Sequence, residues 1–269
     1  MEFFGLTLLG LAVGTFGTLI GAGGGFLLVP ILLLLYPNDD PATITSVSLA
    51  VVFLNASSGS FAYLRQHKVD VRSALWFGAT AVPGSILGAL AVSRVPRTAF
   101  EVLLGVVLIA ASIFLLVSQR PVPGGGHHEA GDYDWFGPQI KHHRPTGLAL
   151  AFVVGFISSL LGIGGGIMHV PALVHVLDFP VHVATATSHF VLAMTAGAGT
   201  VAHIASGTFA GSVLSRTAAL GVGVVVGAQI GAQWAKRAKP KFILRGLAVA
   251  LLLVGARMLY HALVTRRMV

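Results

Sequence analysis

The sequence of 269 residues lacks cysteine and has few charged residues, which make up 10% of it. Without cysteine, disulfide bonds, thiolate catalysis and iron–sulfur ligation are excluded. The low charge, together with 55% hydrophobic residues and a mean hydropathy of +0.86, excludes a water-soluble domain. The first apolar stretch follows Glu2 without a basic region or a small-residue cleavage site, so we expect it to remain as a membrane segment. The composition therefore predicts an all-α polytopic membrane protein.

Carboxylates are missing from the middle of every long apolar stretch. All nine acidic residues fall at or near segment ends or in loops, namely Glu2, Asp39, Asp40, Asp70, Glu101, Glu129, Asp132, Asp134 and Asp178. A cation carrier usually needs an intramembrane carboxylate as a ligand or as a proton relay. The absence of such a residue favours an anion or a neutral solute as the ligand.

Basic residues give the chain a formal net charge of +8, but they lie at segment ends rather than in one stripe. This distribution argues against nucleic-acid binding and is the usual orientation signal of membrane proteins. If the loop at residues 38–40 is outside, most of the 17 Lys and Arg residues lie inside. The two halves of the chain are then inverted relative to each other. Interfacial rings are expected near segment ends, at Tyr36, Tyr63, Trp234 and Tyr260.

Ten apolar stretches follow one another along the chain. They lie near residues 3–20, 26–36, 43–63, 71–93, 98–118, 146–161, 167–177, 183–205, 212–235 and 241–264. Most approach the roughly 20 residues that cross the hydrocarbon core, whereas the stretches at 26–36 and 167–177 have about half that length. The number of full crossings is about eight to ten, depending on whether each long and short pair re-enters or traverses the membrane.

A glycine-rich phrase ending in proline precedes each short stretch. Residues 19–30, with the sequence LIGAGGGFLLVP, align with residues 160–171, with the sequence LLGIGGGIMHVP. The match continues from residues 42–46 to residues 184–188, and from Gly84 and Gly88 to Gly227 and Gly231. The duplication predicts two inverted membrane repeats of about five segments, residues 1–119 and 146–269, each with a glycine-rich helix break followed by a half-length helix. Inverted repeats of this kind generate the alternate states of many secondary carriers.

The polar residues 120–145 are predicted to form a flexible linker on the cytoplasmic side. The linker contains His127, His128, His142 and His143. These histidines could bind a metal, but a solvated His-rich loop is the simpler interpretation. We therefore predict neither a metal site nor a cofactor.

The two glycine loops are candidate anion sites. The short segments that begin at Phe26 and Ile167 would present unpaired N–H groups and the positive end of the helix dipole. Glycines let an oxyanion approach the backbone closely because no Cβ intervenes. The predicted contacts are Gly23, Gly24, Gly25, Gly164, Gly165 and Gly166. The alternative is close helix packing, which we prefer for the pairs Gly84/Gly88 and Gly227/Gly231 because of their four-residue spacing.

Hydroxyl and amide side chains follow in the next segment of each half. Thr45, Ser46, Thr187 and Ser188 could donate hydrogen bonds to the same anion, although such residues in a membrane helix usually bond to their own carbonyl groups. Asn55 lies in mid-segment, where a polar amide is costly. It therefore either bonds a neighbouring helix or lines the pathway.

Five histidines cluster in the second half, at His169, His175, His182, His189 and His203. His169 opens onto the second glycine loop and His189 follows Ser188, so each could hydrogen-bond the anion or carry a proton with it. A metal site is disfavoured, because the spacings give no pair of histidines at i, i+4 and no acidic residue assists. His175 and His182 are explained as structural or interfacial residues.

Taken together and in this order, the motifs resemble the sulfite exporter TauE/SafE family, also called the TSUP superfamily. The resemblance covers nearly all of the chain except the linker. Its motifs are the glycine-rich segment ending in Pro30, the Ala42 to Ser46 phrase, the turn from Leu64-Arg65 to Val69-Asp70, the Gly84/Gly88 helix followed by Arg94-Val95-Pro96, and the second-half counterparts at Gly162 to Pro171, Ala184 to Ser188 and Gly227 to Pro240.

The resemblance implies a carrier in the inner membrane of a bacterium. Such a carrier moves sulfur-containing anions such as sulfite, sulfoacetate or other organosulfonates without ATP. The chain departs from the common pattern at Ile44 and Ala186, where Gly often precedes Thr-Ser, and at Val47 and His189, where Leu is common. His189 is thus a candidate for what is particular to this chain.

Three functional hypotheses follow. The first is a secondary carrier whose partners are a small anion, the lipid bilayer and protons, and which is not an enzyme. The second is an intramembrane hydrolase that uses Ser188 or Ser58 with His189 or His203, but it has no Gly-x-Ser-x-Gly motif and no orienting acid. The third is an anion channel or a structural membrane subunit, which a saturable and trans-stimulated flux would exclude.

Overall fold

A computed structural model describes the whole chain except residues 1, 118–143, 176–178, 210, 236–239 and 267–269. The described residues form α-helices and one short 3-10 helix, η1, without any strand. The elements are α1 (Glu2–Ile20), α2 (Gly25–Leu35), α3 (Pro41–Arg65), α4 (Val71–Ala91), η1 (Val92–Arg94), α5 (Arg97–Val117), α6 (Arg144–Leu160), α7 (Gly166–His175), α8 (Val181–Ala205), α9 (Ser212–Ala235) and α10 (Pro240–Arg266). The predicted all-α class is confirmed.

Five stretches of the described helices are long and apolar enough to cross a membrane. They are Phe3–Ile20, Pro41–Arg65, Val71–Arg94, Arg97–Phe114 and Ser212–Ala235. The helices α2 and α7 that follow the glycine loops have 11 and 10 residues, which is about half a span. The linker predicted at residues 120–145 lies almost entirely outside the described residues.

Local sequence explains where the helices of the first half begin. The Asp40 carboxylate accepts a hydrogen bond from the Thr43 N–H at the start of α3, and the Asp70 carboxylate accepts one from the Ser73 N–H at the start of α4. Pro41 occupies the first turn of α3, where its missing N–H costs nothing. These caps place the two acidic residues at helix ends, away from the middle of the bundle.

The helices pack in pairs that relate the two halves of the chain. Helix α1 packs on α9, as α6 packs on α4, and α3 packs on α9, as α8 packs on α4. The pairs α3 with α8 and α5 with α10 join equivalent helices. Exchange of α1–α5 with α6–α10 leaves this set of pairs unchanged, which is the pattern that a duplicated chain would produce.

Glycines at four-residue spacing provide the close contacts between these pairs. A Cβ built on Gly84 or Gly88 would collide with the Phe152 or Phe156 carbonyl of α6. A Cβ on Gly227 or Gly231 would likewise collide with the α1 backbone, at Leu11 and Thr15. The prediction that these glycines serve helix packing is confirmed.

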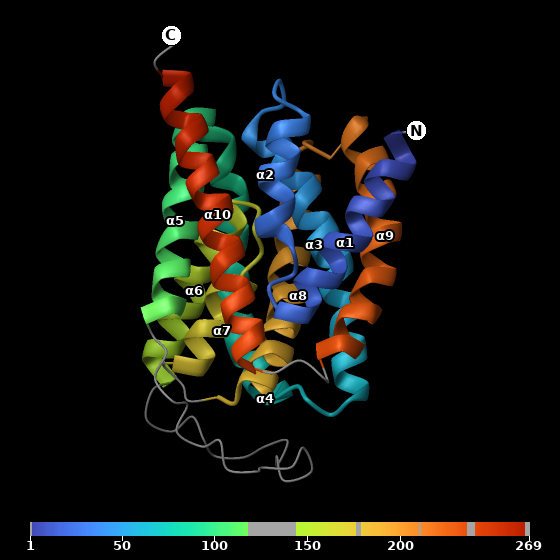
Figure 1. The fold of residues 1–269 in the computed structure, drawn as a ribbon, viewed down its shortest axis with the longest axis vertical. Helices are drawn as coiled ribbons and strands as arrows, with labels where there is room; N and C mark the ends of the chain where they lie inside the picture. Colours follow the sequence, from blue (N-terminus) through green and yellow to red (C-terminus); the bar gives the residue numbers. More distant parts are fainter. Residues whose placement is uncertain (1, 118–143, 176–178, 210, 236–239, 267–269) are drawn as a thin grey trace.

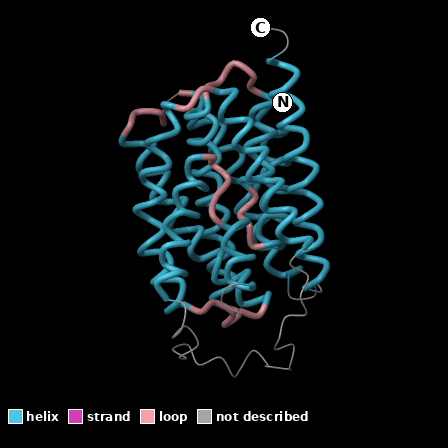
Figure 2. Tube along the Cα trace, turned by 90° about the vertical axis from the view of Figure 1, so that its left-hand side faces the viewer, coloured by secondary structure: helices cyan, strands magenta, loops and turns pink. Residues whose placement is uncertain are grey.

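The long and short helices form hairpins that enter the bundle and return to the same end. The α1–α2 hairpin enters from the end that carries both termini, and the α6–α7 hairpin enters from the opposite end (Figure 1). Both glycine loops lie in the interior of the bundle rather than at its ends (Figure 2). Irregular backbone at such a depth is tolerated because it is covered by protein. Within the described residues, neither pair therefore crosses from one end of the bundle to the other.

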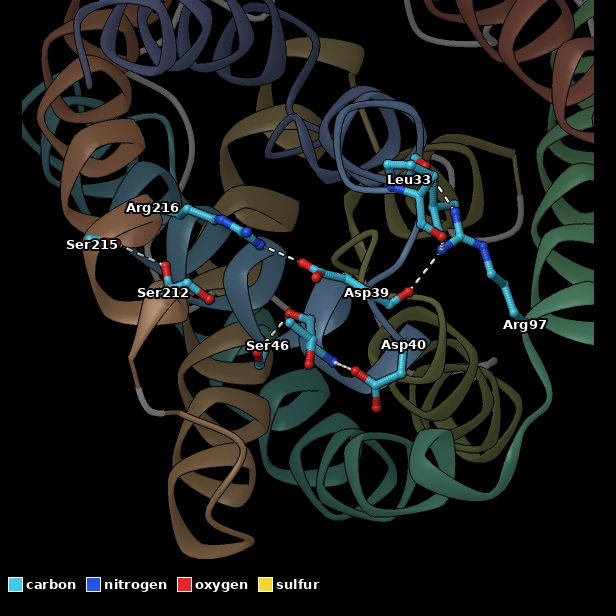
Figure 3. A network of polar contacts seen from close by, with 10 residues as sticks. Leu33, Asp39, Asp40, Ser46, Arg97, Ser212, Ser215 and Arg216 are labelled. Carbon is cyan, nitrogen blue, oxygen red and sulfur yellow. Dashed lines mark hydrogen bonds and ion pairs between the residues drawn. The ribbon is translucent and has the colours of Figure 1, made fainter. Parts of the chain in front are cut away.

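Two arginines hold the loop between α2 and α3 at one end of the bundle (Figure 3). Arg97 donates to the carbonyl groups of Leu33, Pro37 and Asp39, and it bonds Glu101 at 3.0 Å. Arg216 of α9 forms an ion pair with Asp39, and its guanidinium lies 3.5 Å from the centroid of the Tyr36 ring. The loop is therefore tied to α5 and α9 at once.

We expect Arg97→Gln to lower the free energy of unfolding by about 2–3 kcal/mol, because hydrogen bonds to charged groups contribute about 1.5–3 kcal/mol each and Gln cannot reach all of these partners. Glu101 is 4% exposed and would keep only its 3.0 Å contact with His261. Unfolding in detergent, followed by circular dichroism, measures the loss. Arg94→Gln is the matched control, since Arg94 is exposed in the neighbouring η1. An equal effect of both variants would contradict the clamping role of Arg97.

Candidate substrate site

The tips of the two hairpins meet between the middles of α3 and α8. A Cβ built on Gly23 would contact Leu192 and Val52, and a Cβ built on Gly164 would contact the same two side chains. Val52 and Leu192 stand near the middle of α3 and α8, each 25 residues long. The two predicted glycine triplets therefore converge on one central position.

The tips also contact each other through their backbones. Gly25 lies against the carbonyl groups of Gly162 and Ile163, and Gly166 lies against Ala22 and the Gly21 carbonyl. A side chain at either position would push the tips apart. Close packing, which was the alternative to anion contact, is thus part of what these glycines do.

Glycine is also required by the backbone conformation of the first tip. Gly23 and Gly24 have φ of 73° and 80°, and Gly24 caps α2 in the left-handed region. The N–H groups of Ala22 and Gly23 bond the Gly17 carbonyl, and bonding resumes with the N–H groups of Leu27 and Leu28, which both bond the Gly24 carbonyl. The N–H groups of residues 24–26 in between are those that a helix start leaves without an intrahelical partner.

A buried polar cluster adjoins the first tip. Thr18 of α1 donates to Asn55 Oδ1 at 3.1 Å and lies 3.3 Å from His189 Nε2. Asn55 Nδ2 donates to the Gly23 carbonyl at 3.0 Å. All three side chains are fully buried. Asn55 therefore bonds neighbouring elements, which was one of its two predicted roles, and His189 lies within the same cluster.

Tyr63 belongs to this cluster and not to the membrane interface. Its hydroxyl donates to the Thr18 carbonyl at 2.7 Å, and its ring meets the His189 ring edge-on with centroids 5.8 Å apart. Only 1% of Tyr63 is exposed. The interfacial prediction for Tyr63 is wrong, because α3 continues to Arg65 and Tyr63 faces α1 and α8 instead of lipid.

The second tip has a serine cluster at the equivalent place. Ser85 of α4 donates to the Thr195 carbonyl at 2.6 Å, and its hydroxyl lies 2.7 Å from that of Ser159 in α6. Gly199 packs on Leu49 and Ser159 in this cluster, just as Gly59 packs on His189 and Thr18 in the first. Leu49 thus stands where His189 stands in the other half.

These contacts correct the match between α3 and α8. Gly162 packs on Thr45, whereas Gly21 packs on Thr185, two residues before the Thr187 that the sequence match pairs with Thr45. The short motif repeats in sequence, but the register of the packed helices differs by two residues. Helix length and contact with the opposite tip set this register, and local identity does not.

Thr45 and Thr187 lie far apart. Thr45 bonds its own helix at the Pro41 and Ala42 carbonyl groups and lies 3.4 Å from His203 near the end of α8. Thr187 stands near the start of α8, about 24 Å from His203 at 1.5 Å per residue. The expectation that both hydroxyls donate to one anion is therefore wrong. Ser46 likewise bonds the Thr43 carbonyl.

We expect Thr187→Val to lower the free energy of unfolding by about 1 kcal/mol, which is the typical net contribution of one hydrogen bond. The Thr187 hydroxyl accepts from the Asp70 N–H at 3.0 Å, a bond that Val cannot replace. Thr195→Val in the same helix is the matched control, since the described bonds of its hydroxyl go to the Val191 and Leu192 carbonyl groups of α8 itself. Thermal unfolding of both variants measures the difference. Equal melting temperatures would show that the Asp70 contact contributes nothing.

His169 lies at the second tip, as predicted. Its Nδ1 is 2.9 Å from the Gly165 carbonyl, and a Cβ on Gly165 would meet the imidazole. The Nε2 atom of His169 has no hydrogen-bond partner among the described residues, although the side chain is 3% exposed. An unpaired buried acceptor of this kind is costly unless a ligand or a proton binds it.

The serines of the hydrolase hypothesis are not paired with a histidine in the described part of the chain. Ser58 donates to the Val225 carbonyl, and the buried Ser188 hydroxyl has no described partner. Among the same residues, no group of three or more His, Asp or Glu side chains could hold a metal ion. His175 is described only as part of α7.

Sequence reasoning missed Thr18, Ser48, Ser85 and Ser159 as members of the interior. Ser48 donates to the Gly162 carbonyl at 2.6 Å, and Thr18 accepts at its carbonyl from both Tyr63 and the Gly21 N–H. Thr18 and Ser159 each precede a glycine phrase by a few residues at matching places in the repeat. Their matching position before the two glycine phrases was the sequence signal that could have identified Thr18 and Ser159.

The fold and the interior site define the class of protein. Long apolar helices pack around two hairpins whose glycine-rich tips lie in the interior (Figure 2), which is the construction of a multi-pass membrane transporter. A family model described as "Sulfite exporter TauE/SafE" matches residues 6–258. The chain therefore belongs to the sulfite exporter TauE/SafE family.

The names of similar proteins agree with this class. The "Probable membrane transporter protein YunE" of Bacillus subtilis is 32% identical over 278 residues, which cover 98% of this chain and 99% of that protein. The "Probable membrane transporter protein MJ0441" of Methanocaldococcus jannaschii is 29% identical over 208 residues, 76% of this chain and 73% of that protein. No solved structure matches the chain.

Proposed function

We propose that the protein is a secondary carrier of small sulfur-containing anions, such as sulfite, sulfoacetate or other organosulfonates, across the inner membrane of a bacterium. The observation that carries this proposal is the meeting of the two glycine tips between Val52 and Leu192. The helices α2 and α7 both begin at these tips, so the positive ends of their dipoles lie in the interior. An anion is the ligand that such a pair of helix starts favours.

The charges of the described residues support an anionic substrate. Glu101 is buried but lies in the second turn of α5, where it is paired with Arg97 and His261. Asp39, Asp40 and Asp70 stand at helix ends. No described carboxylate is therefore available at the tips to attract a cation.

The substrate contacts that we propose are the backbone N–H groups of the two tips together with Asn55, His169 and His189. His189 and His169 each have a buried ring nitrogen without a described partner. Either atom can accept a proton, so proton movement with the anion is part of the proposal.

The test is flux into proteoliposomes that contain the purified protein. Sulfite, thiosulfate, sulfate, sulfoacetate and taurine are each tested with and without an imposed proton gradient. We expect saturable uptake of one or more of the anions, acceleration by the same anion on the opposite side, and stimulation by an inward proton gradient. Flux that neither saturates nor shows trans-stimulation would identify a channel, and absence of flux for every solute would contradict the proposed substrate class.

A further inference from the structure

A chain of hydrogen bonds connects His189 to the first glycine tip. It runs from His189 Nε2 to the Thr18 hydroxyl at 3.3 Å, from Thr18 to Asn55 Oδ1 at 3.1 Å, and from Asn55 Nδ2 to the Gly23 carbonyl at 3.0 Å. The three side chains come from α8, α1 and α3. All of them are fully buried, so water does not compete for these bonds.

The chain of bonds has a direction. The Gly23 carbonyl can only accept, so the Asn55 amide nitrogen faces it and the Asn55 oxygen faces Thr18. Thr18 has one hydroxyl proton, which it donates to that oxygen. Its oxygen is then left to accept, and His189 Nε2 must carry the proton that it donates to Thr18. In this neutral tautomer, Nδ1 holds the free lone pair.

Nδ1 of His189 has no hydrogen-bond partner among the described residues and is buried. The ring contacts Thr18, Gly59 and the edge of Tyr63, and it also lies near the backbone of Gly21 and Asn55. No charged side chain of the described residues acts on it. The described ionisable side chains on the helices packed against α8, and on α8 itself, are Tyr63, Arg65, Arg72, His169, His182 and His203.

We propose that Thr18 and Asn55 are positioning residues that hold His189 in the Nε2–H tautomer, so that Nδ1 takes up the proton that travels with the anion. This inference rests on the proposed function. The proton adds to Nδ1 and later leaves from Nδ1, while the Nε2 proton stays on its bond to Thr18. The imidazolium formed in this way carries one positive charge at a site without a carboxylate.

A buried positive charge needs a counter-ion, because an unpaired charge in the interior is expensive. The anion at the tips provides this counter-ion, so each of the two ligands favours the binding of the other. Leu49 replaces His189 at the equivalent place in α3 and cannot bind a proton. Through His189, the carrier thus takes one proton with each anion.

The first experiment is 15N NMR of the histidine-labelled protein at neutral to alkaline pH, with the His189 signals assigned by their loss in His189→Gln. We expect the protonated nitrogen of neutral His189 to be Nε2. In Thr18→Val, the Nε2 preference should fall about fivefold to tenfold, as the loss of one buried hydrogen bond of about 1 to 1.4 kcal/mol predicts. Thr18→Ser keeps the hydroxyl and should keep the tautomer.

The second experiment measures flux of the transported anion against pH for the same variants. Thr18→Val should shift or flatten the dependence on the proton gradient, and Thr18→Ser should retain it. A wild-type His189 protonated at Nδ1, or an unchanged tautomer in Thr18→Val, would overturn the positioning role even if anion flux is normal. The expected tautomer without any anion flux would instead contradict the proposed function. A flux that ignores the proton gradient would overturn the coupling.

Discussion

Gly23→Ala is expected to reduce the initial rate of anion flux by about two orders of magnitude while the protein still inserts into the membrane. A misplacement of about 1 Å at a binding site can cost about 100-fold in rate. The new methyl group would collide with the Leu192 side chain and lie 3.2 Å from Val52 Cγ1. The first tip would then move away from the centre that it shares with Gly164.

Two controls separate the possible causes of this loss. Gly207→Ala introduces the same left-handed strain, since φ is 76° there against 73° at Gly23, but nothing lies within 4 Å of its Cβ. It should transport normally. The double variant Gly23→Ala/Leu192→Ala removes the collision, with Leu192→Ala as its own reference.

The double variant decides what Gly23 does. If the new methyl group occupies the place of the anion, flux stays low although the protein is folded, as judged by its melting temperature. Recovery of flux in the double variant would show that Gly23 is needed only for packing. That result would remove the anion contact from this tip.

His189→Gln is expected to abolish the stimulation of flux by an inward proton gradient. Wild-type flux should rise as the pH on the uptake side falls, because protonation of His189 creates the positive charge that the anion balances. Glutamine can still reach a hydrogen-bond partner but cannot take up a proton. The flux of His189→Gln should therefore be nearly independent of pH.

The matched control is His182→Gln, at the start of the same helix. It should keep the pH profile of the wild type. Initial rates in proteoliposomes between mildly acidic and mildly alkaline pH measure both variants. A pH profile of His189→Gln that equals the wild type would assign His189 to packing or to simple hydrogen bonding.

Local features of the fold were predictable from the sequence. The half-length helices were expected to begin at Phe26 and Ile167, and α2 and α7 begin one residue earlier, at Gly25 and Gly166. Glycine breaks and apolar length act within a few residues, so one sequence is enough to find them. The same holds for the spacing of Gly84 and Gly88, which predicts a packing face.

Contacts between distant segments were not predictable in the same way. Thr18 and His189 are 171 residues apart in the chain and meet only because the α1–α2 hairpin enters as far as α8. Tyr63 near the end of α3 has the position of an interfacial residue in sequence but the contacts of a buried one. Nothing local distinguishes these cases, because a single sequence does not report the depth of a hairpin.

The sequence by itself determined that this is a multi-pass helical membrane protein with two glycine breaks. It also showed that no carboxylate lies in the middle of a long apolar stretch. Those properties depend on hydropathy, on backbone freedom and on the positions of charges along the chain. The tertiary structure alone decided which polar groups meet: it paired Thr45 with Gly162 and Thr185 with Gly21, and it separated Thr45 from Thr187. The physical reason is that helix register and hairpin depth follow from packing between the two halves, and a shift of two residues is enough to change every contact.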